Sequence, residues 1–352
     1  MNHSKNPQNK DSVDQQDGQA DEPATTRKTP WHHVPALPIQ SSPYFNWPID
    51  FPAIARWMIK GWLPVSERLI ILLLAIICAL FFQPNLSQTS EISFNWIALI
   101  YVRNLLLMCL VAGGLHWYFY IKRAQGDEYR FDARPLVNKG RAFTFDSQVR
   151  DNMFWTLGSG VAIWTGYEVL MMWALANGYA PALTMPGDML WLVLLIFLLP
   201  MWETTHFFLI HRLIHHTALY QRIHALHHRN TNVGPWSGLS MHPLEHLIYL
   251  STVLIHFVIP SSPLLILFHL SYFTLSAATT HTGYQGIVRR GKIILPLGTF
   301  HHQLHHRYFE CNYGGLETPW DQWTGSFHDG TDQSHQDFLA RRRAKMTPRA
   351  SR

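Results

Sequence analysis

The chain has 352 residues, of which only 14% are charged and 13% are aromatic, including 14 tryptophans. Soluble domains carry about a quarter charged residues, so this composition disfavours a soluble globule and favours lipid contact with interfacial aromatic belts. A formal net charge of +5 could indicate nucleic-acid binding, but the basic residues flank apolar segments, where they orient a membrane protein. The three cysteines show no zinc-finger or disulfide spacing.

The amino-terminal segment, residues 1–45, is rich in Asn, Gln, Ser, Asp and Pro. A segment with so few aliphatic residues cannot bury enough apolar surface to offset its ordering entropy, so we expect a disordered tail there. It contains no apolar core of a signal peptide. The following segment, Pro43–Pro64, carries Phe51 and Trp57 and is typical of a lead-in lying at a membrane interface.

Apolar segments that approach the roughly 20 residues of a membrane span come next. We expect four spans, over residues 69–82, 97–121, 155–176 and 189–210. A fifth apolar unit over 247–278 is interrupted by two prolines, which predicts a helical hairpin or a re-entrant pair.

The loops differ in charge. Residues 122–150 contain seven Lys or Arg, whereas residues 84–96 and 177–188 contain none. By the positive-inside rule the first loop is cytoplasmic, so four spans return both termini and all residues after about Glu203 to the cytoplasm. The sequence therefore predicts an all-α integral membrane bundle over 46–330 with a cytoplasmic, histidine-rich helical cap, followed by a basic tail over 331–352.

Sixteen of the 22 histidines fall between His206 and His306. Most of them form three groups: His211 and His215; His224, His227 and His228; and His302, His305 and His306. Helix positions i, i+3 and i+4 share one face, about 5–6 Å apart. We therefore expect His211 and His215 to bind one metal side by side, and His224 and His228 to do likewise with His227 on the same face. The third group repeats this geometry. Such nitrogen ligands suit iron, zinc, copper or nickel, and the eight imidazoles could enclose two ions.

Other short motifs stand in a fixed order with these groups: Trp236–Glu245 (WSGLSMHPLE), His281–Tyr284 (HTGY), Asn312–Gly314, Trp320–Asp321 and Gly325–Ser326. With this order and spacing, residues 143–327 resemble the fatty acid hydroxylase and sterol desaturase superfamily of membrane di-iron enzymes. Gln322 and Ser326 stand where that family usually has Arg and Thr, without touching the histidine groups.

The resemblance implies two iron ions and O2-dependent hydroxylation of a lipid C–H bond. It adds His281 as a further metal ligand and His242 as a weaker candidate. Four polar residues could orient ligand imidazoles, or serve only as caps and surface polar groups: Glu203, Glu245, Asn312 and Asp321. Because the irons carry the redox chemistry, no separate catalytic acid or base is expected. No flavin, haem or nicotinamide fingerprint is apparent, so we expect electrons from a ferredoxin- or cytochrome-like donor and its reductase.

Several alternatives stay open. A desaturase would use the same centre on a sterol or fatty acyl chain. A zinc-dependent membrane hydrolase would need a carboxylate base beside the metal, as in HExxH, which neither HxxHH group supplies. A metal transporter or haem-binding protein would need ionisable residues within the spans, such as Arg103, His256 and His269. The substrate could be a sterol, a sphingoid base, a fatty acyl chain, an ether lipid or a carotenoid. A chain of this length without a fused haem module or an ER-retrieval tail fits a bacterial inner membrane.

Overall fold

The computed structural model describes residues 30–63 and 65–346, and this part of the chain is almost entirely helical. Its two strands, β1 (Gly286–Arg289) and β2 (Lys292–Pro296), form an antiparallel hairpin that pairs Gly286 with Pro296 and has an irregularity between Ile287 and Val288. The all-α prediction is therefore confirmed apart from this small hairpin.

The helices of the first half are η1 (Pro43–Phe45), α1 (Phe51–Trp62), α2 (Glu67–Phe81), η2 (Leu86–Thr89), α3 (Phe94–Met108), η3 (Cys109–Gly113), α4 (Gly114–His116), η4 (Trp117–Ile121), α5 (Gln148–Trp155), η5 (Thr156–Gly160) and α6 (Val161–Ala176). Those of the second half are α7 (Met189–Ile214), α8 (Thr217–Leu219), η6 (Tyr220–His224), α9 (Ala225–His228), η7 (Pro235–Ser237), α10 (Pro243–Leu250), η8 (Ser251–Phe257), α11 (Pro263–Thr280), α12 (Phe300–Tyr308), α13 (Trp320–Trp323) and α14 (Asp332–Met346). Several begin at side-chain caps, because the hydroxyl of Ser66 accepts from Leu69 N and that of Ser262 accepts from Leu265 N.

Three described helices are long and apolar enough to cross a membrane: Phe94–Ile121, Met189–Ile214 and Pro263–Thr280. A fourth span is possible if α1 and α2, which meet at a bend of 53°, are counted as one. The chain is thus a membrane protein whose described residues contain three to four helices that could span a membrane, against four spans expected. These helices include the predicted spans over 97–121 and 189–210 and, in the bent α1–α2 pair, that over 69–82, whereas Pro263–Thr280 lies in the predicted fifth apolar unit. The predicted span over 155–176 is helical, mostly as η5 and α6, but it is not among these helices.

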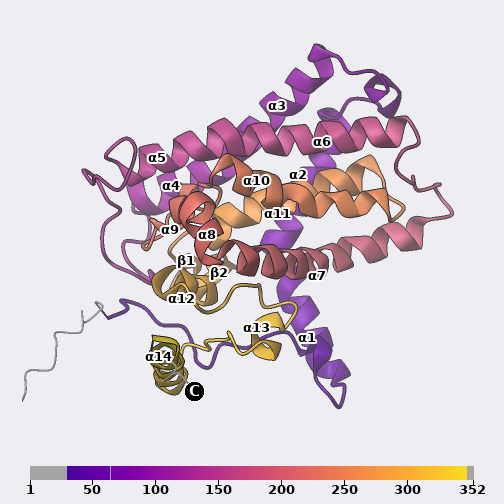
Figure 1. The fold of residues 1–352 in the computed structure, drawn as a ribbon. Helices are drawn as coiled ribbons and strands as arrows, with labels where there is room; N and C mark the ends of the chain where they lie inside the picture. Colours follow the sequence, from indigo (N-terminus) through magenta and orange to yellow (C-terminus); the bar gives the residue numbers. More distant parts are fainter. Residues whose placement is uncertain (1–29, 64, 347–352) are drawn as a thin grey trace, which may run out of the picture. The chain divides into compact units, whose positions relative to one another are not determined.

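Helix α11 forms the centre of the bundle, with 13 of its 18 residues buried. It contacts α2, α6 and α7, and Figure 1 shows α6, α11 and α7 lying alongside one another. A helix that is apolar all round must be enclosed by protein or lipid, and here protein encloses most of it. Together α10, η8 and α11 form the predicted hairpin, because α10 and η8 run alongside α11 and the chain reverses near Ser261.

The arginine within the second predicted span faces the protein interior. The guanidinium of Arg103 lies 2.5 Å from a carboxylate oxygen of Glu168, and the amide oxygen of Asn104 accepts from the same guanidinium at 2.9 Å. Both side chains of this ion pair are buried, so each offsets part of the other's desolvation penalty. These contacts connect α3 to α6 in the apolar part of the bundle.

Both predicted tails differ from the structure. Residues 1–29 and 347–352 lie outside the described residues, but residues 31–45 follow the domain surface, where Ile39 N donates to Asp329 O at 2.8 Å. The edge of the Trp31 ring packs on Phe300, which supplies the apolar contact that composition alone did not reveal. At the other end, α14 buries Phe338 against Tyr308, so residues 332–346 form part of the cap.

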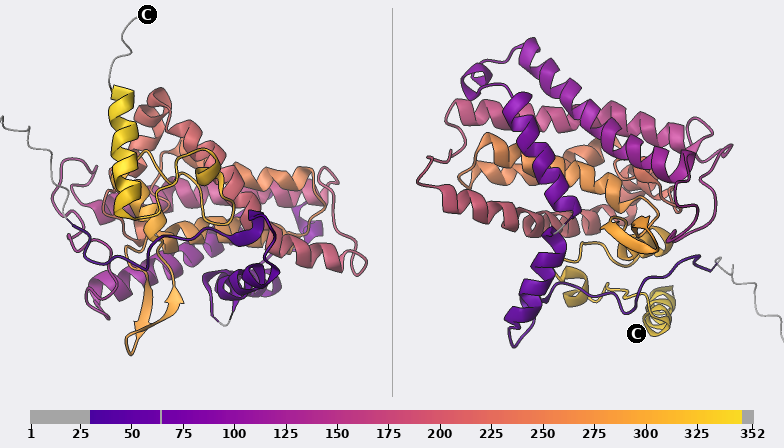
Figure 2. Two further views of the ribbon diagram at one scale, coloured as in Figure 1. Left: turned by 90° about the horizontal axis from the view of Figure 1, so that it is seen from below. Right: turned by 180° about the vertical axis from the view of Figure 1, so that it is seen from behind.

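The histidine-rich segments meet at one end of the bundle. Helix α7 ends there, α8 to α9 follow directly, and the carboxyl end of α11 and helix α12 lie beside them, as the views of Figure 2 also show. The basic 122–150 loop contacts the same end, because Phe131 N donates to Gly283 O and Asp132 forms a buried ion pair with Arg307 of α12.

Candidate metal centre

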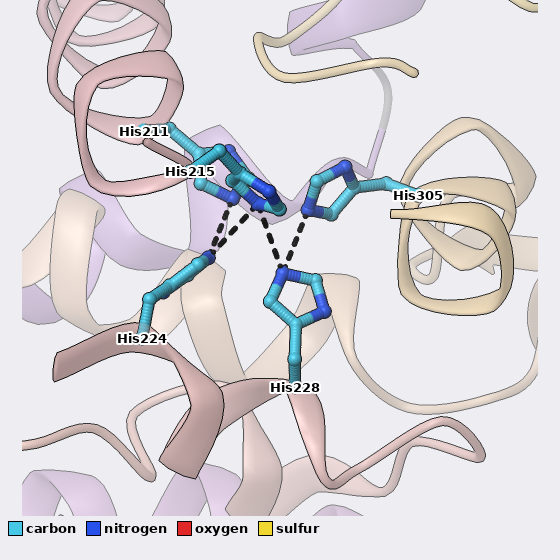
Figure 3. Close-up of side chains that lie close together, drawn as sticks. All are labelled: His211, His215, His224, His228 and His305. Carbon is cyan, nitrogen blue, oxygen red and sulfur yellow. Dashed lines mark hydrogen bonds between the residues drawn. The ribbon is translucent and has the colours of Figure 1, made fainter. Parts of the chain in front are cut away.

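The structure brings all nine predicted metal ligands together, in two groups. A five-histidine group contains His211, His215, His224, His228 and His305, and a four-histidine group contains His227, His281, His302 and His306. Within each group, one ring nitrogen from every residue lies within 4.8 Å of the others. All nine are buried except His215, which is partly exposed. Figure 3 shows the five rings of the first group converging from three segments of the chain.

The distribution over helices corrects one part of the prediction. His227 does not share the face of His224 and His228 but belongs to the four-histidine group, and His305 and His306 separate in the same way. Consecutive residues on a helix point about 100° apart, so α9 and α12 each present histidines to both groups. The two groups therefore adjoin, with ring centroids of His228 and His306 4.9 Å apart.

Hydrogen bonds at Nδ1 fix which ring nitrogen carries the proton. The Nδ1 of His211 lies 2.6 Å from Tyr313 O, that of His305 lies 2.7 Å from Cys311 O, and that of His281 lies 2.7 Å from Ala277 O. A carbonyl oxygen only accepts, so each Nδ1 carries the hydrogen and each Nε2 presents a lone pair to its group.

These lone pairs converge on one another. The Nε2 atoms of His281, His302 and His306 form a triangle with edges of 3.0–3.1 Å. In the five-histidine group, His224 Nε2 lies 3.1 Å from the Nε2 atoms of both His211 and His215. Ring nitrogens that all present lone pairs cannot form hydrogen bonds with one another. A cation can bind them together, because metal–imidazole bonds are about 2.0–2.1 Å long. The donor set thus fits two metal ions held by imidazole.

Burial favours the neutral, metal-binding form of the rings. Desolvation lowers the pKa of His227 to about 4 and that of His215 to about 2, and it holds the pKa of His228 and His305 well below the usual value. The neighbouring histidines lower several of these values further, because two imidazolium ions in one group would repel each other.

One predicted orienting residue contacts the centre directly. Glu245 of α10 places Oε1 2.7 Å from His224 Nδ1, in the arrangement by which carboxylates orient metal-bound imidazoles. Asp321 acts on the centre through a loop. Its carboxylate accepts hydrogen bonds from Tyr313 N and Gly314 N and so fixes the loop in which Tyr313 O accepts from His211 Nδ1.

The other candidates have different places. The amide of Asn312 forms hydrogen bonds with backbone groups of His301 and His328, and within the described residues with no imidazole of the two histidine groups. His242 caps α10 by accepting from Leu244 N, and among the described residues it belongs to neither group. Glu203 lies 3.6 Å from His269, away from both groups. The sequence did not predict that the carbonyls of Cys311 and Ala277 orient His305 and His281. Every residue has a backbone carbonyl, and only the fold determines which one points at a histidine.

A cavity of about 340 Å³ borders the four-histidine group. Its lining includes His227, His281 and His302 together with apolar side chains such as Phe207, Phe273 and Leu297. Polar side chains line it as well, among them Trp57, Lys60, Arg68 and Glu317, where Arg68 and Glu317 pair and the Trp57 indole donates to the same carboxylate. A largely apolar cavity with a few polar groups fits an amphiphilic ligand.

Comparison with known proteins agrees with the motifs. Residues 188–326 match the model of the fatty acid hydroxylase family, so this region has the family's pattern and the predicted resemblance is confirmed. The chain is similar to the lathosterol oxidase of Homo sapiens, with 33% identity over 120 residues, which are 34% of this chain and 40% of that protein. No solved structure matches.

Two further relatives carry related names. The Delta(7)-sterol 5(6)-desaturase of Gibberella zeae is 29% identical over 138 residues, 39% of this chain and 42% of that protein. Methylsterol monooxygenase 1 of Danio rerio is 32% identical over 123 residues, 34% of this chain and 42% of that protein. The chain thus spans about two fifths of the length of these curated relatives. All three come from eukaryotes, so they give no support to the expected bacterial setting.

Proposed function

We propose that this protein is a membrane oxidoreductase that uses two histidine-bound iron ions and O2 to hydroxylate a lipid C–H bond. The observation that carries the proposal is the pair of adjoining imidazole groups, with lone pairs converging, beside a largely apolar cavity. Iron in such a site supplies activation of O2 and removal of hydrogen from an unactivated carbon. Hydroxylation consumes O2, two electrons and two protons for each alcohol and water formed.

The protein's own residues position the reactants. The five-histidine group would hold one ion and the four-histidine group the other, with Glu245 and the aimed carbonyls fixing the ring orientations. A lipid chain in the cavity would lie against Phe207 and Phe273, with its reacting carbon beside His302. Burial of these rings excludes water from the centre. The polar side chains of Arg68 and Glu317, which also line the cavity, would hold the lipid head group.

A desaturase is the second candidate, because two of the relatives above are named as a sterol oxidase and a sterol desaturase. The same centre would then remove two hydrogens from adjacent carbons and form an alkene. We assign electrons to a separate ferredoxin- or cytochrome-like carrier.

We further propose that the cap faces the cytoplasm. The basic 122–150 loop contacts the cap end of the bundle, while the loop over 177–188, which lacks basic residues, pairs with Ser261 where the α10–α11 hairpin reverses. This charge asymmetry agrees with the positive-inside rule. A membrane-impermeant thiol reagent should label Tyr179→Cys in intact cells and Arg123→Cys only after permeabilisation.

The test of the reaction compares two histidine variants. Cells expressing wild type, His228→Ala or His242→Ala are analysed by lipid mass spectrometry, and the purified proteins by metal analysis and O2 consumption. Wild type and His242→Ala should contain iron and form the same oxidised lipid, with an added oxygen for hydroxylation or two hydrogens fewer for desaturation. His228→Ala should form none. The proposal fails if His228→Ala forms the wild-type product or if the active wild-type protein contains zinc and no iron.

A further inference from the structure

A second hollow, of about 220 Å³, lies on the cap between α14, the end of α7 and the loops over 310–313 and 324–326. We propose that this basic pocket is the docking site of an acidic, one-electron carrier protein. The inference rests on the proposed function, which requires electrons from outside the chain. It assigns a role to α14, which lies beyond the family match.

Charge is the first argument. The pocket is lined by the basic side chains of Arg212, Arg341, Arg342 and Lys345 and by one carboxylate, that of Glu310. All four basic residues are exposed. An exposed cluster of one sign attracts an acidic partner and orients it during the encounter.

The basic groups are also held in place. Arg341 donates to Gly325 O at 2.9 Å, and Arg212 donates to the Thr324 hydroxyl at 3.1 Å. These bonds connect α14 and α7 to the same short loop. A preorganised charged surface loses less entropy when a partner binds than a set of freely moving side chains.

Proximity to the metal centre is the second argument. Tyr313 lines the pocket, and its ring centroid lies 4.9 Å from that of His215 and 5.6 Å from that of His305. The guanidinium of Arg212 lies over the same ring, 5.6 Å from its centroid. A single aromatic side chain therefore separates a carrier in the pocket from the five-histidine group.

The electron balance is simple. Each docking oxidises a reduced iron–sulfur or haem carrier by one electron, and two dockings supply the two electrons that hydroxylation needs. No bond to the carrier forms or breaks. The basic run of α14 alone could equally contact anionic lipid, but the position of Tyr313 between the pocket and the histidines favours a redox partner.

The experiment uses an acidic plant-type [2Fe–2S] ferredoxin as the probe. Its affinity is measured for the metal-free full-length protein in zwitterionic nanodiscs at low and high salt. The double variant Arg341→Glu/Arg342→Glu is compared with Arg289→Glu/Lys292→Glu, which reverses two exposed charges on the β1–β2 hairpin. The first should bind ferredoxin at least about tenfold more weakly, and the control should match wild type within about twofold.

A second readout separates docking from chemistry. In the iron-loaded proteins, ferredoxin-driven reduction should slow in the α14 variant, while dithionite with O2 should give wild-type amounts of product. If dithionite gives no product in wild type, the proposed function fails, and the binding measurement still decides the docking site. Equal ferredoxin affinity in wild type and the α14 variant overturns the docking proposal, as does salt-independent binding. The docking proposal is also overturned if the α14 variant differs from wild type only in how strongly it associates with anionic vesicles.

Discussion

Removing the carboxylate of Glu245 should weaken metal binding without weakening the fold. The Oε1 of Glu245 lies 2.7 Å from His224 Nδ1, and its buried Oε2 has no hydrogen-bond partner among the described residues. Burial raises the pKa of Glu245 well above its usual value, so the metal-free fold gains little from this carboxyl group. With a cation on His224 Nε2, the same carboxylate accepts a charge-assisted hydrogen bond.

The expected effect of Glu245→Ala is a loss of about 10–100-fold in metal affinity, equal to about 1.4–2.7 kcal/mol. Thermal unfolding of the metal-free variant should remain at or above the wild-type midpoint. Competition with a chelator under anaerobic conditions measures the affinity for Fe2+, and Glu245→Gln, which keeps an acceptor oxygen, should fall between the two. Wild-type affinity in Glu245→Ala, or a fall in both affinity and metal-free stability, would refute the orienting role.

Three further outcomes are expected. His302→Ala should lower the metal content from two ions to one per chain, measured by elemental analysis, since the five-histidine group keeps all its members; unchanged content would contradict the division into two groups. Trp31→Ala should cost about 1–3 kcal/mol in thermal unfolding, because it removes a ring that packs on Phe300 and under a guanidinium; an unchanged midpoint would show that this segment adds no stability. Gly238→Ala should abolish folded protein in size-exclusion chromatography, because its Cβ would lie 1.9 Å from a carbonyl oxygen of α11. Gly166→Ala, which meets nothing within 4 Å, should fold normally; equal yields of the two would contradict the close backbone approach.

Most histidines of the two groups could be predicted from the sequence because their spacing is a local property, whereas His281 was implied only by the family resemblance. Positions i, i+3 and i+4 share a helix face whatever surrounds the helix, and His211 and His215 do lie in one group. The division of His227 from His228 was not predictable in the same way. Which of two neighbouring residues faces which group depends on how α9 and α12 pack, and that is set by contacts far apart in the chain.

The spans show the same limit. Hydrophobicity located the α7 and α11 regions, but it could not show that α11 is largely buried within the protein while Phe94–Ile121 and Met189–Ile214 leave most of their residues unburied. Composition also missed the ordering of residues 31–45, since Trp31 and Ile39 suffice to attach an otherwise polar segment once their partners are in place. The orienting carbonyls carry no signal in the sequence at all.

Helix α12 supplies His302 and His306 to one group and His305 to the other. A shift or rotation of this helix would therefore change the geometry of both groups at once. Two ions held there would share one support, because any movement of α12 that opens or tightens one group also displaces a histidine of the other.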